Sequence, residues 1–297
     1  MTILELLEWG NNKLKTEKID SSMLDAEILL AYILRLPRSK LFTGLGDDID
    51  DQRSDQYRFL IKRRMRHEPI ATIISKKSFY GRNFLVNRFV LSPRPETEIL
   101  IENAISSAKN LDGETWFADI GTGSGAIAVT LAIETKLPVI AIDISNQALT
   151  VARTNAETHR VADLIDFKNG DTSLPLIKLF RGLKNTDQPP PDNLIICANL
   201  PYLSTKQWED TQPKVHDWEP RVALEAGTDG LDAYWKLFRE LSENRKLLSD
   251  QLTTIIEIDP SQSKAIKALV LHLFSEAKIE IKKDLAGLNR IVIIKLN

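Results

Sequence analysis

The fold is decided by the stretch Trp116-Phe117-Ala118-Asp119-Ile120-Gly121-Thr122-Gly123-Ser124-Gly125, where an apolar run ends in glycines at alternating positions. Glycine has no side chain, so the backbone can turn tightly and approach a ligand closely. The spacing is G-x-G-x-G with an acid two residues upstream, and Ala126 breaks the G-x-G-x-x-G pattern of dinucleotide-binding enzymes. The stretch therefore predicts a ligand site at a strand-to-helix turn, where a helix N-terminus attracts an anionic group.

Strands and helices alternate after this stretch. Apolar runs at 116–120, 139–143, 194–198 and 255–258 predict strands, and helices are expected at 125–135, 147–158 and 263–274. Such alternation is typical of an α/β fold with a parallel sheet and helices on both faces. The last two runs, 279–282 and 290–295, predict an antiparallel hairpin at one sheet edge. Residues 181–193 contain three consecutive prolines and are expected to form an insertion loop.

The chain before this stretch has a different pattern. Helical periodicity up to about residue 67 predicts a small helical domain, placed at residues 1–77. Residues 78–95 carry short β-type runs around Asn87-Arg88, which suggest a hairpin or an extended linker. We place a β-hairpin linker at 78–95 and the catalytic domain at 96–297. In the helical part Arg58, Lys62 and Arg66 recur every fourth residue. A solvated face is the favoured interpretation, and a docking surface for an acidic protein or RNA is the alternative.

The composition excludes several classes of protein. The 297 residues are 43% hydrophobic and 27% charged, with a formal net charge of -2, so nothing attracts nucleic acid or membranes globally. The histidines and the single Cys197 lack metal-ligand spacing, so no metal is predicted. No apolar run approaches the roughly 18 to 20 residues that span a bilayer. Without a signal-peptide pattern or paired cysteines, a cytoplasmic protein is expected, with a monomer as the default.

Two further acidic positions accompany the glycine motif. Asp143 ends the next predicted strand, where a carboxylate can accept hydrogen bonds from both ribose hydroxyls of a nucleoside. Asp171 and Thr172 follow a third strand and could contact an adenine, although Asp171 alone would be interpreted as a turn residue. This ordered set resembles the class I methyltransferases and implies a mostly parallel seven-stranded sheet that binds S-adenosylmethionine. Gly121, Thr122, Gly123, Ser124 and Gly125 would contact this cofactor with Asp143, Asp171, Thr172 and Asn199.

A second motif, Asn199-Leu200-Pro201-Tyr202, follows the apolar run at 194–198. The proline favours an extended Leu200, which can present its carbonyl beside the side-chain oxygen of Asn199. Two acceptors would then hold both N–H groups of a planar amide or amine nitrogen during methyl transfer. We therefore predict that Asn199 and Tyr202 are catalytic, with Tyr202 stacking on the flat group. Substrate would contact all four residues.

Further passages resemble one methyltransferase family. Arg94-Pro95-Glu96-Thr97-Glu98, the passage from Glu219 to Leu231 and the helical N-terminal part look like the release factor glutamine methyltransferases, or HemK-type family. The resemblance covers essentially the whole chain. It implies transfer of a methyl group from S-adenosylmethionine to the side-chain amide (N5) of the glutamine in the Gly-Gly-Gln motif of peptide chain release factors.

Leu200 departs from the family pattern, which usually has proline at this position. The tetrapeptide N-L-P-Y also resembles the loop of ribosomal RNA adenine N6-dimethyltransferases, which act on a comparable planar amine. Those enzymes usually carry extra helices after the catalytic domain, whereas this chain has its helical part first. The release factor substrate is therefore preferred, with N6-adenine methylation of ribosomal RNA as the alternative. A binding module without activity is disfavoured because Asn199, Pro201 and Tyr202 are all present.

Overall fold

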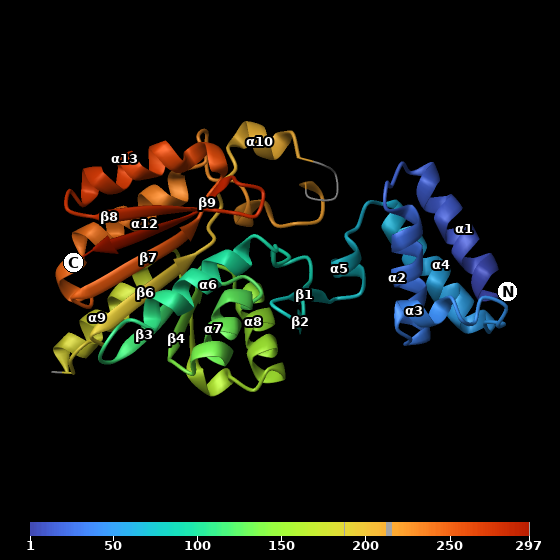
Figure 1. Cartoon of the computed structure of the whole chain (residues 1–297), viewed down its shortest axis with the longest axis horizontal. Coiled ribbons are helices and arrows are strands. Elements are labelled where there is room, and N and C mark those ends of the chain that lie inside the picture. The colour runs from blue at the N-terminus through green and yellow to red at the C-terminus, as the bar shows by residue number, and fades with distance from the viewer. Residues whose placement is uncertain (187, 212–215, 297) are drawn as a thin grey trace. The chain divides into compact units, whose positions relative to one another are not determined.

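The computed structural model describes residues 1–186, 188–211 and 216–296. The chain forms two compact units. The first contains Met1–Lys76 together with the described residues 216–218, and the second contains Lys77–Thr211 and the chain from Glu219 onward. Figure 1 shows the helices of the first unit in blue and the sheet of the second in green to red.

The second unit is built on a seven-stranded sheet in the order β5-β4-β3-β6-β7-β9-β8. Its strands are β3 (Thr115–Ile120), β4 (Val139–Asp143), β5 (Ile165–Asn169), β6 (Asn193–Ala198), β7 (Gln251–Glu257), β8 (Lys278–Lys283) and β9 (Asn289–Leu296). The five strands from β5 to β7 are parallel, and β9 is antiparallel to both of its neighbours. The predicted mostly parallel sheet with a terminal hairpin at its edge is confirmed.

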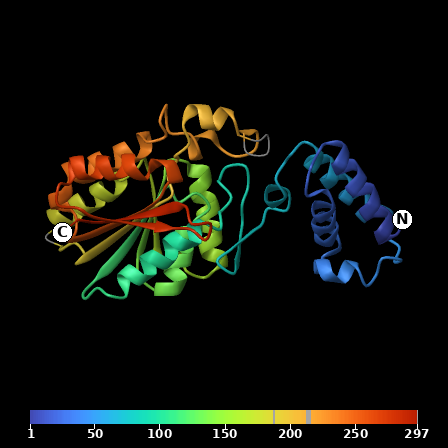
Figure 2. The same ribbon diagram turned by 45° about the horizontal axis from the view of Figure 1, so that its top comes forward.

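Helices cover both faces of this sheet (Figures 1 and 2). They are α6 (Thr97–Ala108), α7 (Ala126–Thr135), α8 (Asn146–Thr158), α9 (Leu174–Asn185), α12 (Asp232–Glu243) and α13 (Ser263–Leu273). The short helix α10 (Thr205–Glu209) has no buried residue and does not belong to either sheet core. Alternate residues of β3 point to opposite faces: Phe117 joins the core under α6, α7 and α8, while Ala118 and Ile120 join the core under α9, α12 and α13. Because β3 is buried on both faces, its sequence is apolar rather than alternating.

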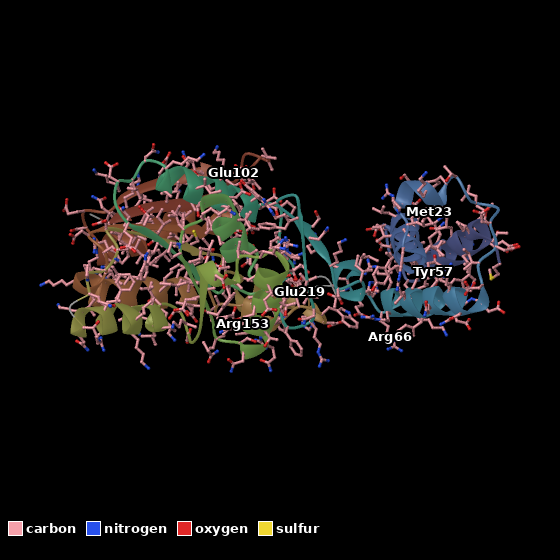
Figure 3. All side chains as sticks on the ribbon, turned by 90° about the horizontal axis from the view of Figure 1, so that it is seen from below. Met23, Tyr57, Arg66, Glu102, Arg153 and Glu219 are labelled. Carbon is pink, nitrogen blue, oxygen red and sulfur yellow. The ribbon has the colours of Figure 1, made fainter. Side chains whose placement is uncertain are left out.

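The first unit is a small helical bundle around Tyr57. Its helices are α1 (Ile3–Thr16), α2 (Ser22–Leu34), α3 (Arg38–Leu41), α4 (Asp51–Met65) and α5 (Ile70–Ile73). Figure 3 labels Tyr57, which is fully buried, and Met23, which is exposed at the surface. Gly10 on α1 is required here, because a Cβ atom would lie 2.0 Å from the Tyr57 hydroxyl oxygen. A buried ion pair between Arg64 and Asp25, with 2.7 Å from nitrogen to oxygen, joins α4 to α2.

The predicted hairpin around Asn87-Arg88 is wrong in position. The structure pairs β1 (Lys77–Phe79) with β2 (Arg82–Phe84), and the turn lies at Tyr80 and Gly81. Both turn residues have positive φ angles, as hairpins with two-residue turns require. The run after Asn87 contains no strand, and its apolar residues serve other contacts: Val90 is buried and Leu91 lines a cavity. The hairpin and this run both belong to the second unit.

The expected insertion loop at 181–193 is partly helical. Helix α9 continues to Asn185, because Leu176, Ile177 and Phe180 bury one of its faces and the prolines begin only at Pro189. Pro189–Pro191 carry no regular structure, in agreement with the helix-breaking effect of proline. Residue 187 of this segment lies outside the described residues.

Candidate active site

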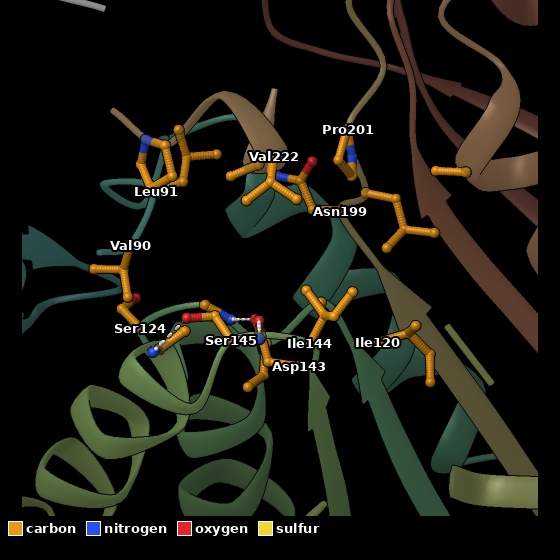
Figure 4. Close-up of a pocket in the computed structure, with 18 of the residues that line it drawn as sticks. Val90, Leu91, Ile120, Ser124, Asp143, Ile144, Ser145, Asn199, Pro201 and Val222 are labelled. Carbon is orange, nitrogen blue, oxygen red and sulfur yellow. Dashed lines mark hydrogen bonds between the residues drawn. The ribbon is translucent and has the colours of Figure 1, made fainter. Parts of the chain in front are cut away.

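A cavity of about 420 Å³ opens at the carboxyl ends of β3, β4 and β6 in the second unit. Open parallel sheets bind their ligands at this edge. Figure 4 shows Asn199 and Pro201 across the cavity from Ser124 and Asp143. We call Gly121–Gly125 with Asp143–Ser145 the glycine side, although Gly125 is the N-cap of α7 and does not itself line the cavity. We call Thr97 with Asn199–Pro201 the asparagine side. The remaining wall contains Phe89–Arg94 and parts of the segment 220–236.

The glycine side begins with a buried acid. Asp119 Oδ2 accepts hydrogen bonds from Thr122 Oγ1 at 2.6 Å and from the Ala128 backbone N–H at 3.1 Å. Burial raises the pKa of Asp119 to about 7, although these two donors oppose the shift. Gly121 has φ +76°, and a Cβ atom there would lie 3.0 Å from Leu200 Cδ2. Asp119 therefore fixes the loop, and the missing side chain of Gly121 lets the two sides of the cavity approach each other.

Asp143 ends β4 and faces the cavity as predicted. Its Oδ2 accepts from the Gly123 backbone N–H at 2.8 Å, and its Oδ1 accepts from the Ser145 backbone N–H at 2.9 Å. Burial raises the pKa of Asp143, while backbone donors oppose the shift. Each carboxylate oxygen can accept a second hydrogen bond, so the group has room for two ligand hydroxyls.

Asp171 and Thr172 also line the cavity, but both are engaged by neighbours that the sequence did not suggest. Asp171 forms an ion pair with Lys236 of α12, which lines the same wall. Thr172 Oγ1 donates to Glu240 Oε2 at 2.7 Å. Glu240 is 6% exposed and also accepts from the Ser173 hydroxyl. These contacts anchor the loop after β5 to α12.

On the asparagine side, Asn199 has a defined amide orientation. Its Nδ2 donates to Glu257 Oε2 at 2.9 Å and to Thr97 Oγ1 at 3.1 Å. Glu257 is an acceptor when ionised, so the nitrogen end of the amide belongs on this side. Asn199 Oδ1 is then the side-chain atom that remains for an N–H donor in the cavity.

Leu200 and Pro201 line the cavity with Asn199, whereas Tyr202 does not. The Leu200 side chain is 6% exposed and packs in the core between the sheet and α12. The Tyr202 ring packs against the same core, and its backbone oxygen accepts from Gln262 Nε2 at 2.9 Å. Burial raises the pKa of Tyr202. The structure thus brings three of the four predicted substrate residues to the cavity and places the fourth behind them.

Sequence reasoning missed Thr97 and Glu257 as members of the site. Thr97 lies inside the R-P-E-T-E passage, which indicates the family but does not by itself predict a contact with Asn199. Glu257 directly follows the apolar pair Ile255-Ile256 at the end of a buried strand, and a carboxylate at the ligand-binding edge of a sheet was a signal that could have been used. Arg94 was also missed: its Nη2 lies 2.8 Å and 2.6 Å from the two carboxylate oxygens of buried Glu219.

Two negative findings apply to the described residues only. No group of three or more histidine, cysteine, aspartate or glutamate side chains among them could hold a metal ion. No helix among them is long and apolar enough to cross a membrane.

Comparisons with known proteins agree with this geometry. Residues 5–74 match the family described as PrmC N-terminal domain, and residues 99–176 match ribosomal protein L11 methyltransferase (PrmA). The chain is 37% identical to a release factor glutamine methyltransferase of Bacillus subtilis, over 98% of this chain and 96% of that protein. It is 34% identical to a protein of the same name from Rhodopirellula baltica, over 98% and 95% of the two chains.

Solved structures support the fold alone. The catalytic domain of hMettl16, solved in complex with MAT2A 3'UTR hairpin 1, is 14% identical with a TM-score of 0.55, covering 83% of this chain and 81% of that one. The human methyltransferase 10 domain containing protein is 14% identical with a TM-score of 0.51, over 73% and 89% of the chains. With the full-length relatives, these findings confirm the resemblance predicted from the motifs: the chain is an enzyme that belongs to the release factor glutamine methyltransferase family.

Proposed function

We propose that the chain transfers the methyl group of S-adenosylmethionine to the side-chain amide nitrogen, N5, of the glutamine in the Gly-Gly-Gln motif of peptide chain release factors. The observation that carries this proposal is the orientation of the Asn199 amide, whose nitrogen is held by Glu257 and Thr97. It leaves an acceptor for a substrate N–H group at the ligand-binding edge of the sheet.

The residues of the glycine side fit the proposed cofactor. Asp143 offers two carboxylate oxygens to the ribose hydroxyls, as expected for a nucleoside without a 2'-phosphate. Asp119 does not line the cavity and is fully buried, so it holds the glycine loop through Thr122 and Ala128 rather than contacting the cofactor. We assign cofactor contacts to Gly121–Gly125 and Asp143, with Asp171 and Thr172 at the adenine end.

The asparagine side suits a planar nitrogen. When bound, S-adenosylmethionine supplies an electrophilic methyl group on a sulfonium and leaves as S-adenosylhomocysteine. An amide lone pair is delocalised and nucleophilic only when the nitrogen becomes tetrahedral. Asn199 Oδ1 and the Leu200 carbonyl would accept the two N–H groups and favour that geometry. The nitrogen needs no strong base before it attacks, because it becomes acidic as it gains the methyl group.

Leu200 is compatible with this role. Its side chain is directed into the core, so the cavity would use its backbone carbonyl rather than its side chain. Tyr202 acts through its contacts behind the loop rather than by stacking on substrate. We therefore retain Asn199 as the catalytic residue and treat Tyr202 as a residue that supports the acceptor loop.

The partner assignment follows from the same proposal. Residues 1–77 would recognise the release factor, 78–95 would link the domains, and 96–297 would carry the reaction. Since release factors act at the ribosome, we place the enzyme in the cytoplasm, as a monomer that forms no stable complex with nucleic acid. The basic residues Arg58, Lys62 and Arg66 are a candidate contact for an acidic face of the partner.

The test is incubation of the protein with labelled S-adenosylmethionine and either a release factor or ribosomal RNA. We expect label on the release factor, mapped by peptide mass spectrometry to the Gly-Gly-Gln glutamine. A release factor with glutamine changed to alanine at that position is the matched control and should stay unlabelled. Label on RNA adenine alone would replace the protein substrate with the alternative predicted from the N-L-P-Y sequence.

A further inference from the structure

Glu257 is a buried carboxylate that takes no direct part in the proposed methyl transfer. It ends β7 and is 1% exposed. Strands β6 and β7 are parallel, with Ala198 paired to Ile256, so Asn199 and Glu257 occupy the next positions of the two neighbouring strands. The sheet register itself therefore places this carboxylate beside the catalytic amide.

Three side chains on or beside the N-L-P-Y tetrapeptide donate hydrogen bonds to the Glu257 carboxylate. Its Oε2 accepts from Thr97 Oγ1 at 2.7 Å and from Asn199 Nδ2 at 2.9 Å. A hydrogen bond from the Tyr202 side chain also acts on its carboxylate. Burying a carboxylate costs free energy unless it is hydrogen-bonded. The donors that satisfy Glu257 come from α6 and from both ends of the N-L-P-Y tetrapeptide. The carboxylate thus connects the residues that would hold the substrate nitrogen.

This arrangement discriminates between the two orientations of the Asn199 amide. With Nδ2 toward Glu257, the amide makes a charge-assisted hydrogen bond. If the amide were rotated by half a turn, Oδ1 would face an ionised carboxylate oxygen, and two acceptors would repel each other. The Thr97 hydroxyl strengthens the preference, because it donates its proton to Glu257 and accepts from Asn199 Nδ2.

We propose that Glu257 is a positioning residue that orients the Asn199 amide, with the Thr97 hydroxyl as its partner, so that Asn199 Oδ1 faces the substrate nitrogen. Glu257 itself does not touch substrate. This inference rests on the proposed function and deepens it, since the same network would also select an acceptor group with an N–H donor over one that offers only lone pairs.

The test compares Glu257→Gln with two variants of Thr97. Glutamine keeps the shape but can present either a donor or an acceptor to Asn199, so the amide loses its preferred orientation. We expect kcat for methyl transfer to fall by about tenfold or more in Glu257→Gln, with the Kd for S-adenosylmethionine within about twofold of wild type. Thr97→Val should behave similarly, and Thr97→Ser should restore turnover because it keeps the hydroxyl.

Glu240→Gln is the matched control. Glu240 is another buried carboxylate of the same unit, but it accepts from Thr172 and Ser173 beside the glycine side. Its loss should weaken cofactor binding with less effect on kcat at saturating cofactor. Melting temperatures of all variants are measured in parallel.

Two outcomes would overturn the inference. One is turnover of Glu257→Gln within about twofold of wild type. The other is a parallel loss of melting temperature, cofactor affinity and kcat, which would indicate a purely structural role. Failure of the proposed function is distinguishable, because the wild-type protein would then label no release factor. If it labelled RNA adenine instead, the same variants would be compared on that substrate, which also presents two N–H groups.

Discussion

The two sides of the cavity are built differently. The glycine side uses one short segment and the end of the adjacent strand, and its key contacts join side chains to backbone N–H groups, as between Asp143 and Gly123. The asparagine side uses side chains from three distant segments, since Thr97 and Glu257 are 160 residues apart and Asn199 is 58 residues before Glu257. Binding of a common cofactor thus depends on local backbone shape, whereas the choice of acceptor depends on tertiary contacts.

The largest expected effect breaks the asparagine side. Asn199→Ala should lower kcat by about 10²- to 10³-fold, because it removes a placed dipole that acts as charge develops on the nitrogen. Cofactor affinity, measured by calorimetry, should stay near that of wild type. Asn193→Ala is the control at the other end of β6: this residue bonds the Asp112 carbonyl at 2.7 Å, so its loss should lower the melting temperature instead. Wild-type turnover in Asn199→Ala would contradict the catalytic assignment.

The next effect breaks the glycine side. Asp143→Ala should weaken binding of S-adenosylmethionine by roughly 1.5 to 3 kcal/mol, because the two ribose hydroxyls of the bound cofactor lose their charged hydrogen-bond acceptor. Turnover at saturating cofactor should change much less. Asp166→Ala on neighbouring β5, an exposed residue paired with Lys168, serves as the control and should bind normally. Unchanged affinity in Asp143→Ala, measured by calorimetry, would remove Asp143 from the cofactor site.

A smaller effect should couple the two sides. Gly121→Ala places a Cβ atom at positive φ and against Leu200 Cδ2, which strains the loop by about 1 kcal/mol and shifts the acceptor loop. Both cofactor affinity and turnover should therefore fall several-fold. In Gly182→Ala, on α9, the new Cβ atom meets nothing within 4 Å and should slightly stabilise the helix. If Gly121→Ala changed affinity alone, the two sides would act independently.

The smallest effect near neutral pH concerns protonation of Glu257. Burial raises the pKa of Glu257 above the usual glutamate value. The hydrogen bond from Thr97 and the charge of Arg290 oppose this shift, whereas the charge of Glu96 adds to it. Tyr202 and Tyr234 also face the carboxylate. As pH falls through this raised pKa, the carboxylate becomes a donor and no longer orients Asn199, so kcat falls; as pH rises above it, kcat is flat. We expect this acid limb in wild type at saturating substrates and its loss in Glu257→Gln. An identical limb in both proteins would assign it to another group.

The position of the glycine side at the edge of the sheet could be predicted from the sequence because the information for it is local. Gly121–Gly125 and Asp143 lie within 25 positions of one another, and the strand–loop–helix pattern places them without knowledge of the sheet order. Asn199 was placed correctly for the same reason, as the residue after an apolar strand. The orientation of its amide was not predictable, because it depends on two distant residues. The parallel pairing of β6 with β7 brings Glu257 beside Asn199, and the packing of α6 on the sheet brings Thr97 to both.

Two features show where local patterns are not enough. The hairpin was expected around Asn87-Arg88, a polar pair between apolar runs, yet those runs are apolar because they cover the core and line the cavity. Pairing occurs instead at Tyr80-Gly81, where the turn accepts two positive φ angles. The structure also places the Tyr202 ring against the core rather than on the cavity wall, since an aromatic residue after a loop can pack inward as easily as toward a ligand.

The N-terminal unit is discontinuous along the chain. Residues 216–218 cluster with it, and the Trp218 indole N–H donates to the Arg66 carbonyl at 3.0 Å. A recombinant fragment ending at residue 76 would therefore lack part of the unit it was meant to represent. Exchange of this unit between relatives would then require three crossover points rather than one.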